Sequence, residues 1–392
     1  MIWLCLALIV IAFLVALPTT AVIIRISRAA GALDTPGIGG QVKAPPRPVP
    51  NTGGIAIILA IVLPLLAGLG LFQRIDPAAA AEWRTDFSLI PADLHEHIAG
   101  IQQQTPLALL LIGCLALLHV LGLIDDRRPL GPFVKLAIMT LPALAVPLVT
   151  TLIPSMSETR LLTLLDSRVG GAWLSILLTA MWFLVVTNAL NFIDNMDGLA
   201  AGVVAIAGSL FMAAAIVRPQ PQWFVAASLA LMVGACLGFL VFNWPRAGGA
   251  RIFMGDSGSL VLGFLLAFLT TRTTFYAGRS ADTAAWYAVL MPLVVLAVPL
   301  YDFASVVIIR LSQRRSPFVG DLQHLSHRLV QRGLSRRSSV LVIWGLTGIT
   351  GVTGVLLSSA TAWQAILIGV QILVILGVIA AFEYASTKGR AA

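Results

Sequence analysis

The sequence predicts an all-α, polytopic membrane protein with about eleven transmembrane helices. Of its 392 residues, 58% are hydrophobic and only 11% are charged, which is far from the balance of a soluble domain. Its apolar runs are long enough for helices that cross an apolar core about 30 Å thick, and they lack the alternation of barrel strands. These runs cover residues 2–24, 53–72, 105–124, 132–152, 171–187, 198–217, 223–242, 258–275, 283–309, 338–358 and 362–383.

The basic residues predict the orientation of these helices. Most of the 25 Lys and Arg residues fall on one side, which should be cytoplasmic, so the N-terminus is outside and the C-terminus is cytoplasmic. The first run has no positive start and no clear cleavage site, and it precedes Arg25 and Arg28. We therefore expect a retained helix rather than a signal peptide. Residues 1–392 form a single domain, whose active face comprises loops 25–52, 125–131, 188–197, 243–257 and 310–337.

Composition also argues against other classes of protein. The net charge of +8 reflects the one-sided basic loops and attraction to anionic lipid headgroups, and no nucleic-acid recognition module accompanies it. Cys5, Cys114 and Cys236 lie in apolar runs without metal or disulfide spacing. No internal repeat of the kind found in many transporters is visible.

The carboxylates of the predicted cytoplasmic side indicate one active face. Polar and charged groups at a membrane edge are costly unless something binds them, so such a cluster suggests a functional site. Short Asp side chains at helix ends would suit a hard cation together with a phosphate group. The residues of this set are Asp34, Asp125, Asp126, Asp194, Asp197, Asp256 and Asp321.

The most informative motif is N-A-L-N-F-I-D-N-M-D-G-L at residues 188–199. It places Asn188, Asn191, Asp194 and Asp197 three residues apart. Successive members rotate by about −60° on an α-helix, so all four share one face only if the helix tightens or unwinds. Gly198 makes a chain break easy at that point. The alternative is that the four residues only cap two helices.

Two further motifs carry acids at helix ends. The third run ends in H-V-L-G-L-I-D-D-R-R, where Asp125 and Asp126 point about 100° apart, so that one can face a cleft while the other caps or pairs. Alternatively, the two neighbouring Arg residues simply neutralise them. The string R-I-F-M-G-D-S-G-S at 251–259 puts Asp256 at a helix start, where free N–H groups favour phosphate and an Asp can hold its metal. As a plain cap, Asp256 or Ser257 would be ordinary.

The remaining candidates are basic or amide side chains. Asn243 begins N-W-P-R at another cytoplasmic helix end, and Lys43 could line the site. In R-R-S-P-F-V-G-D-L-Q-H-L-S-H-R at 314–328, we expect His324, His327 and Arg328 to contact phosphate. The alternative is a basic amphipathic segment on the membrane surface. Asp302, the acid within a span, is assigned no chemistry and is expected to pair with a polar neighbour, Tyr301 or Arg310.

Taken together and in this order, the motifs resemble the polyprenyl-phosphate N-acetylhexosamine-1-phosphate transferases, of the glycosyltransferase 4 type. The likeness runs from Leu33 to Arg337, and the 314–328 segment is similar to the branch that transfers N-acetylglucosamine-1-phosphate. The chain departs from the family pattern in four places, one of which is an insertion of three residues between Asn243 and Asp256. Asn195 stands where Gly is common, Ser326 interrupts the H-x-H-H cluster, and Lys43 alone remains of Arg-Lys-x-His.

The resemblance implies a bacterial cytoplasmic (inner) membrane enzyme with a cytoplasmic active site. It would convert a UDP-N-acetylhexosamine and undecaprenyl or another polyprenyl phosphate into polyprenyl-diphospho-sugar and UMP, for cell-wall, lipopolysaccharide or teichoic acid synthesis. It also implies Mg²⁺, with Mn²⁺ as an alternative, and a membrane-lipid environment; a homodimer is compatible with it. The implied catalytic residues are Asp125, Asp126, Asp194, Asp197 and Asp256; the substrate-binding residues are Lys43, Asn188, Asn191, Asn243, His324, His327 and Arg328; and the metal ligands are Asp256, Asp194, Asp197 and Asn191.

Several alternatives remain open within this hypothesis. Asp256 is the preferred Mg²⁺ ligand, and Asp125 or Asp126 would orient or deprotonate the lipid phosphate. Single transfer is favoured, although an aspartyl-phosphate intermediate is compatible with the residues. The main alternative function is transfer of phospho-N-acetylmuramoyl-pentapeptide or of another sugar. An ion-coupled transporter would need acids near mid-span, and a lipid-binding scaffold would not need this density of Asp.

Overall fold

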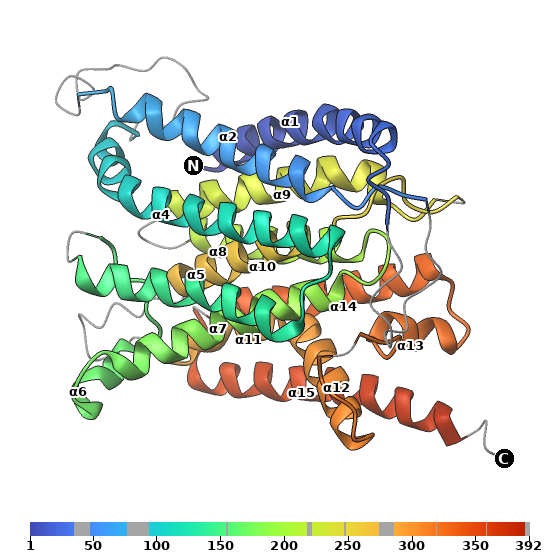
Figure 1. The fold of residues 1–392 in the computed structure, drawn as a ribbon. Coiled ribbons are helices and arrows are strands. Elements are labelled where there is room, and N and C mark those ends of the chain that lie inside the picture. The colour runs from blue at the N-terminus through green and yellow to red at the C-terminus, as the bar shows by residue number, and fades with distance from the viewer. Residues whose placement is uncertain are drawn as a thin grey trace.

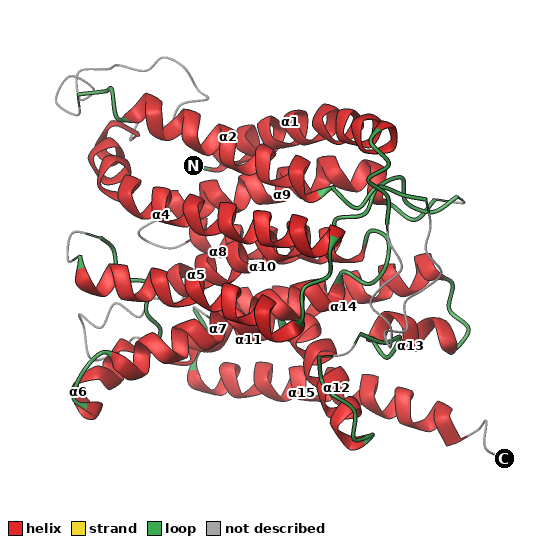
Figure 2. Cartoon of the chain, viewed as in Figure 1, coloured by secondary structure: helices red, strands yellow, loops and turns green. Residues whose placement is uncertain are grey.

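The computed structural model is a bundle of long helices that run along a common direction (Figure 1). It describes residues 1–34, 48–76, 94–153, 156–217, 222–246, 248–273, 286–318, 320–357 and 359–388. Within these residues the regular structure is helical, apart from one isolated bridge between Leu33 and Pro50 (Figure 2). The predicted all-α class is therefore confirmed.

The helices follow the apolar runs closely. The helix of the third run, α4, is much longer than predicted, because it starts at Leu94, well before residue 105. The elements are α1 (Ile2–Ala29), α2 (Gly54–Phe72), α4 (Leu94–Arg127), α5 (Pro132–Leu152), η1 (Thr163–Leu165), α6 (Asp166–Val169), α7 (Trp173–Ile193), α8 (Leu199–Val217), α9 (Trp223–Asn243), α10 (Asp256–Thr273), η2 (Trp286–Leu290), α11 (Met291–Val295), α12 (Ala297–Ser312), α13 (Leu325–Gln331), α14 (Arg336–Leu356) and α15 (Ala362–Lys388).

Nine helices among the described residues are long and apolar enough to cross a membrane: α1, α2, α4, α5, α7, α8, α9, α14 and α15. The chain is thus a multi-pass membrane protein. Exposed apolar side chains such as Trp3, Leu152 and Leu373 cover its sides, as expected for a surface in contact with lipid. The number of eleven crossings and the direction of insertion stay predictions.

The prediction of one continuous helix over 283–309 is wrong. In its described part, the segment is divided into η2, α11 and α12, with Leu296 between the last two. Pro299 has no N–H to donate to the carbonyl of Val295, so the helical hydrogen bond that would join α11 to α12 cannot form. The break gives α12 a direction of its own, visible in Figure 1.

The interior of the bundle lies around α9 and α10. α1 and α8 both pack along α9, while α10 packs between α4 and α7. In the most apolar window of α9, 72% of the residues are buried, whereas the corresponding value for α15 is 6%. The C-terminal helix is therefore peripheral, along the edge of the bundle next to α12 and α14 (Figure 1).

Close approach fixes the start of α10. A side chain at Gly122 of α4 would collide with the backbone of Ser257, and one at Gly54 of α2 would collide with that of Gly258. Glycine at both positions lets three helices meet backbone to backbone. This contact holds Asp256, the first residue of α10, at the end of the bundle.

Candidate functional site

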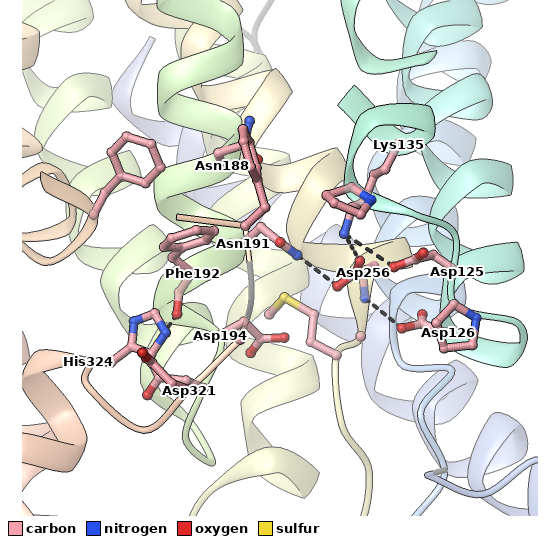
Figure 3. Close-up of a pocket in the computed structure, with 18 of the residues that line it drawn as sticks. Asp125, Asp126, Lys135, Asn188, Asn191, Phe192, Asp194, Asp256, Asp321 and His324 are labelled. Atoms are coloured by element: carbon pink, nitrogen blue, oxygen red, sulfur yellow. Dashed lines mark hydrogen bonds and ion pairs between the residues drawn. The ribbon is translucent and has the colours of Figure 1, made fainter. Parts of the chain in front are cut away.

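A cavity of about 990 Å³ lies at the end of the bundle where α4 and α7 end and α10 begins. Every carboxylate predicted for the active face lines it, from Asp34 to Asp321. Figure 3 shows Asp125, Asp126, Asp194, Asp256 and Asp321 among them. The prediction that these acids share one face is confirmed. Five amides and five basic side chains complete the polar lining: Asn51, Asn188, Asn191, Asn195, Asn243, Lys135, Arg310, His324, His327 and Arg336.

Lys135 joins two of the carboxylates. Its ammonium forms ion pairs with Asp125, at 3.3 Å, and with Asp256 (Figure 3). The same Asp256 carboxylate accepts a hydrogen bond from the Asn191 amide at 2.8 Å. Side chains of α4, α5, α7 and α10 thus form one connected network. The sequence suggested no role for Lys135, although its place in the first turn after Pro132, close to the Asp pair, was a usable signal.

Asp126 holds the start of α10. Its carboxylate accepts hydrogen bonds from the backbone N–H of Asp256 at 2.9 Å and of Ser257 at 3.2 Å, and from the Asn51 amide at 3.1 Å. The alternative in which Asp256 or Ser257 caps this helix is therefore wrong, because the cap is Asp126 of α4. These two N–H groups are also occupied, so they are not free to bind phosphate as the sequence suggested.

The predicted chain break in the Asn–Asp motif is confirmed. Asn188 and Asn191 belong to the last turns of α7, which ends at Ile193, and α8 begins after Gly198, whose φ is +78°. Asn191 also donates to the Ser259 hydroxyl at 2.9 Å. The Asn188 amide donates to the Leu184 carbonyl at 2.7 Å, which leaves its oxygen at the cavity.

Asp194 differs from the other acids of the motif. Among the described residues, its carboxylate forms no hydrogen bond or ion pair, and Figure 3 shows it beside Asp256. Burial, together with the charges of Asp256, Asp126 and Asp197, raises the pKa of Asp194 well above its usual value. An uncompensated carboxylate at a cavity favours a cation as its partner.

Asp197 and Asn243 are committed to holding a loop. Asp197 accepts the backbone N–H of Ala250 at 2.9 Å. Asn243 accepts the N–H of Gly198 at 2.8 Å and donates to the Ile252 carbonyl at 2.8 Å. Both side chains are buried, and their bonds tie loop 244–255 to the turn between α7 and α8. Both residues border the cavity, but the bonds observed for them are made to backbone groups of the loop and the turn, so they position the cavity wall.

The two histidines lie at the short helix α13. His324 precedes its first residue, and its Nδ1 lies 2.9 Å from an oxygen of Asp302, which also accepts the N–H of Leu325 at 2.6 Å. The expectation that Asp302 pairs with Tyr301 or Arg310 is therefore wrong. Burial, with His324 and Arg336 nearby, lowers the pKa of His327 to about 4, so this imidazole is neutral at pH 7.

Arg310 and Asp321 form a second charged pair that the sequence did not predict. The guanidinium is 2% exposed, donates to both carboxylate oxygens at 3.2 and 3.0 Å, and lies over the Phe192 ring. Burial opposes ionisation of Asp321, but Arg310 and the N–H of Gln323 outweigh it and hold the pKa of Asp321 below its usual value. A basic residue at the end of an apolar helix gave no specific signal of this pair.

Of the predicted substrate-binding residues, one lies outside the described part of the chain and one is placed away from the cavity. Lys43 lies outside the described residues. Arg328 is absent from the cavity wall, and its guanidinium donates to Glu383, Ser305 and the carbonyl of Gln323. Nine-tenths of the Arg328 side chain is buried in this network, so its donors are already used.

The cavity provides oxygen ligands suited to a hard cation. Mg²⁺ in proteins is commonly held by one or two carboxylates together with substrate phosphates and water. Asp194 and Asp256 provide two carboxylates, and Asn191 lies beside them. Among the described residues, no three His, Cys, Asp or Glu side chains are grouped as a metal cage. The set fits a cation that takes its remaining ligands from a bound phosphate.

Comparisons with known proteins agree with this chemistry. The family model described as glycosyl transferase family 4 matches residues 108–274. The chain is 29% identical over 377 residues to a probable undecaprenyl-phosphate N-acetylglucosaminyl 1-phosphate transferase of Bacillus subtilis, covering 95% of this chain and 91% of that protein. It is 35% identical to the decaprenyl-phosphate N-acetylglucosaminephosphotransferase of Mycobacterium tuberculosis, over 58% of each protein. It is 28% identical to the undecaprenyl-phosphate alpha-N-acetylglucosaminyl 1-phosphate transferase of Escherichia coli, over 61% of this chain and 62% of the relative.

Proposed function

This chain belongs to glycosyl transferase family 4, with the polyprenyl-phosphate N-acetylglucosamine-1-phosphate transferases, and we propose that it catalyses their reaction. It transfers N-acetylglucosamine-1-phosphate from UDP-N-acetylglucosamine to undecaprenyl or another polyprenyl phosphate, and it releases UMP. The observation that carries this proposal is that one cavity gathers acids, amides and cations at one end of a membrane bundle. Both substrates are phosphates, and the acceptor brings an apolar tail.

The cavity offers both kinds of surface that these substrates need. Its polar part contains Asp256, Lys135 and His327, while Leu136, Met139 and Val307 belong to its apolar part. An acceptor phosphate can therefore meet charged groups while its tail stays on the lipid side. The location that follows is the bacterial inner membrane with the cavity at the cytoplasm, where nucleotide sugars are made.

The transfer forms a bond from an acceptor-phosphate oxygen to the sugar-linked phosphorus and breaks the bond from that phosphorus to UMP. Positioning and charge neutralisation provide most of the catalysis in phosphoryl transfer. Asp256 and Asp194 would hold Mg²⁺, which would neutralise charge on the UDP diphosphate when bound. Lys135 holds Asp125 and Asp256 close together through its two ion pairs.

The remaining groups have separate roles in this proposal. Asp125 orients the lipid phosphate, which is ionised and needs little help as a nucleophile. Asp126 positions the start of α10 rather than acting as a base, because its oxygens accept backbone N–H groups. His324 and His327 face the sugar or phosphate of the donor, while Arg310 holds Asp321 at the cavity wall. A single displacement is preferred, since the ionised acceptor phosphate can attack directly and no Asp of the cavity is marked as a nucleophile.

The test is release of UMP by the purified protein with undecaprenyl phosphate and Mg²⁺. UDP-N-acetylglucosamine and UDP-N-acetylmuramoyl-pentapeptide are offered in parallel, and we expect release from the first alone. Release from the second alone would assign the chain to the pentapeptide branch, and silence with both would contradict the proposed reaction. Asp256→Asn should abolish Mg²⁺-dependent release while the protein stays folded.

A further inference from the structure

The short helix α13 carries His327 and begins next to His324, yet it has only 7 residues. A helix of this length is not stable by itself in water, so its direction depends on what holds it. At its start, Asp302 of α12 accepts the N–H of Leu325 and contacts His324. A second attachment is made in the middle of α13 through Arg328.

Arg328 connects α13 to the last helix of the chain. Its Nε donates to Oε1 of Glu383 at 2.8 Å, and a second guanidinium nitrogen donates to the Ser305 hydroxyl of α12 at 2.9 Å. The hydroxyl of Tyr301 donates to the other carboxylate oxygen of Glu383 at 2.9 Å. Arg332 donates to the Glu383 carbonyl. Glu383 is thus bonded to both α12 and α13.

These contacts are unusual for α15, because the rest of that helix is barely buried. The Glu383 side chain is only 12% exposed, and its partner Arg328 is 9% exposed. A buried ion pair contributes little net stability, but removing one partner leaves the other charge buried and unpaired. Such a pair is well suited to fixing one arrangement of α13 against α12 and α15.

We propose that Glu383 is a positioning residue that holds α13, and with it His324 and His327, in the orientation needed to bind the donor. This inference rests on the proposed function for its kinetic readout. Glu383 and its partner Arg328 both lie outside residues 108–274, the segment that the family model matches. It acts through Arg328 and does not touch the substrate.

The first test compares Glu383→Gln with Gln371→Ala, an exposed position on the same helix. For Glu383→Gln we expect KM for UDP-N-acetylglucosamine to rise and kcat/KM to fall by up to roughly 10²-fold. The Mg²⁺ concentration for half-maximal activity should stay the same, because Asp194 and Asp256 lie on other elements. The control should behave as wild type. An unchanged KM, or a parallel shift in Mg²⁺ dependence, would contradict the proposal.

A second test does not depend on catalysis. Hydrogen exchange of the amides of residues 325–331 should be faster in Glu383→Gln than in the control. The exchanged pair Arg328→Glu with Glu383→Arg should slow it again and recover part of the KM. If the wild-type protein released no UMP, the proposed function would fail. The hydrogen-exchange experiment would still decide whether Glu383 positions α13. If Glu383→Gln did not fold, Tyr301→Phe would remove one hydrogen bond of the same carboxylate. Equal exchange rates in Tyr301→Phe and wild type would then contradict the positioning role of Glu383.

Discussion

Asp126 of α4 accepts a hydrogen bond from the backbone N–H of Asp256, the first residue of α10, at 2.9 Å (Figure 3). The contact joins two acids that are separated by 130 residues in the chain. One acid caps the helix on which the other is presented to the cavity. Mutations at these two acids should therefore have different consequences.

Asp126→Ala should lower the stability of the protein. It removes the acceptor of two N–H groups of α10 and of the Asn51 amide. Loss of a helix cap costs about 0.5–2 kcal/mol. We expect a lower Tm in detergent, with Asp126→Asn in between because its carbonyl still accepts. If both variants kept the wild-type Tm, the capping role would be wrong.

Asp194→Asn should lower activity without lowering the stability of the protein. The Asp194 carboxylate forms no bond among the described residues and lies near three other acids. Removing its charge relieves repulsion, so Tm should be unchanged or higher. UMP release should fall by at least roughly 10–100-fold, because loss of a metal ligand should cost no less than loss of a residue that only supports a ligand. Thermal unfolding and UMP release of one preparation check both expectations, and a loss of Tm would show that Asp194 is structural.

Lys135→Gln tests the competition between an ammonium and a metal for one carboxylate. Lys135 pairs with Asp256, so a cation must share that carboxylate with it. Without Lys135, half-saturation by Mg²⁺ should occur at a lower concentration, while kcat should fall by roughly 10²–10³-fold through the lost electrostatic stabilisation. A Mg²⁺ titration of UMP release separates the two effects. Lys135→Arg, which keeps the charge, is the control and should retain more activity.

The sequence predicted the helices well because apolar length is a local property of the chain. The run 132–152 coincides with α5, and 362–383 lies within α15. The break at Leu296 was missed because prolines are tolerated inside other helices of this protein, such as Pro18 in α1. Hydrophobicity alone therefore could not identify which proline interrupts a span.

The sequence was sufficient to predict which acids share the cavity, since each motif lies at a helix end on the same side. Their partners were not predictable. Lys135 and Asp256 are 121 residues apart, and His324 and Asp302 are 22 apart. These pairs depend on how helices approach each other, which no spacing in the motifs encodes. The role expected for Arg328 shows the same limit, because its true neighbour, Glu383, is on the last helix.

The titration of His327 predicts a pH dependence of stability. Its pKa is about 4 in the folded protein and about 6.5 when unfolded, so the unfolded chain binds more protons between these values. The stability present above pH 6.5 should therefore be lost progressively as the pH falls towards 4. Tm measured from pH 7 to pH 5 should drop less in His327→Gln than in wild type. Equal losses would mean that His327 is not buried in its neutral form.

Asn195 and Ser326 should be energetically coupled. The Ser326 hydroxyl donates to the Asn195 side-chain oxygen, and the Asn195 amide donates to the Phe192 carbonyl at 2.7 Å. This bond links the turn that carries Asp194 to α13. In a double-mutant cycle with Asn195→Gly and Ser326→Ala, we expect the second change to cost less once the first is present, with a coupling of about 0.5–1.5 kcal/mol. The cycle is measured on Tm and on kcat/KM. The variant Ser326→His should be impaired alone and should improve when Asn195→Gly removes the side chain that bonds to residue 326. Additive effects would contradict the coupling.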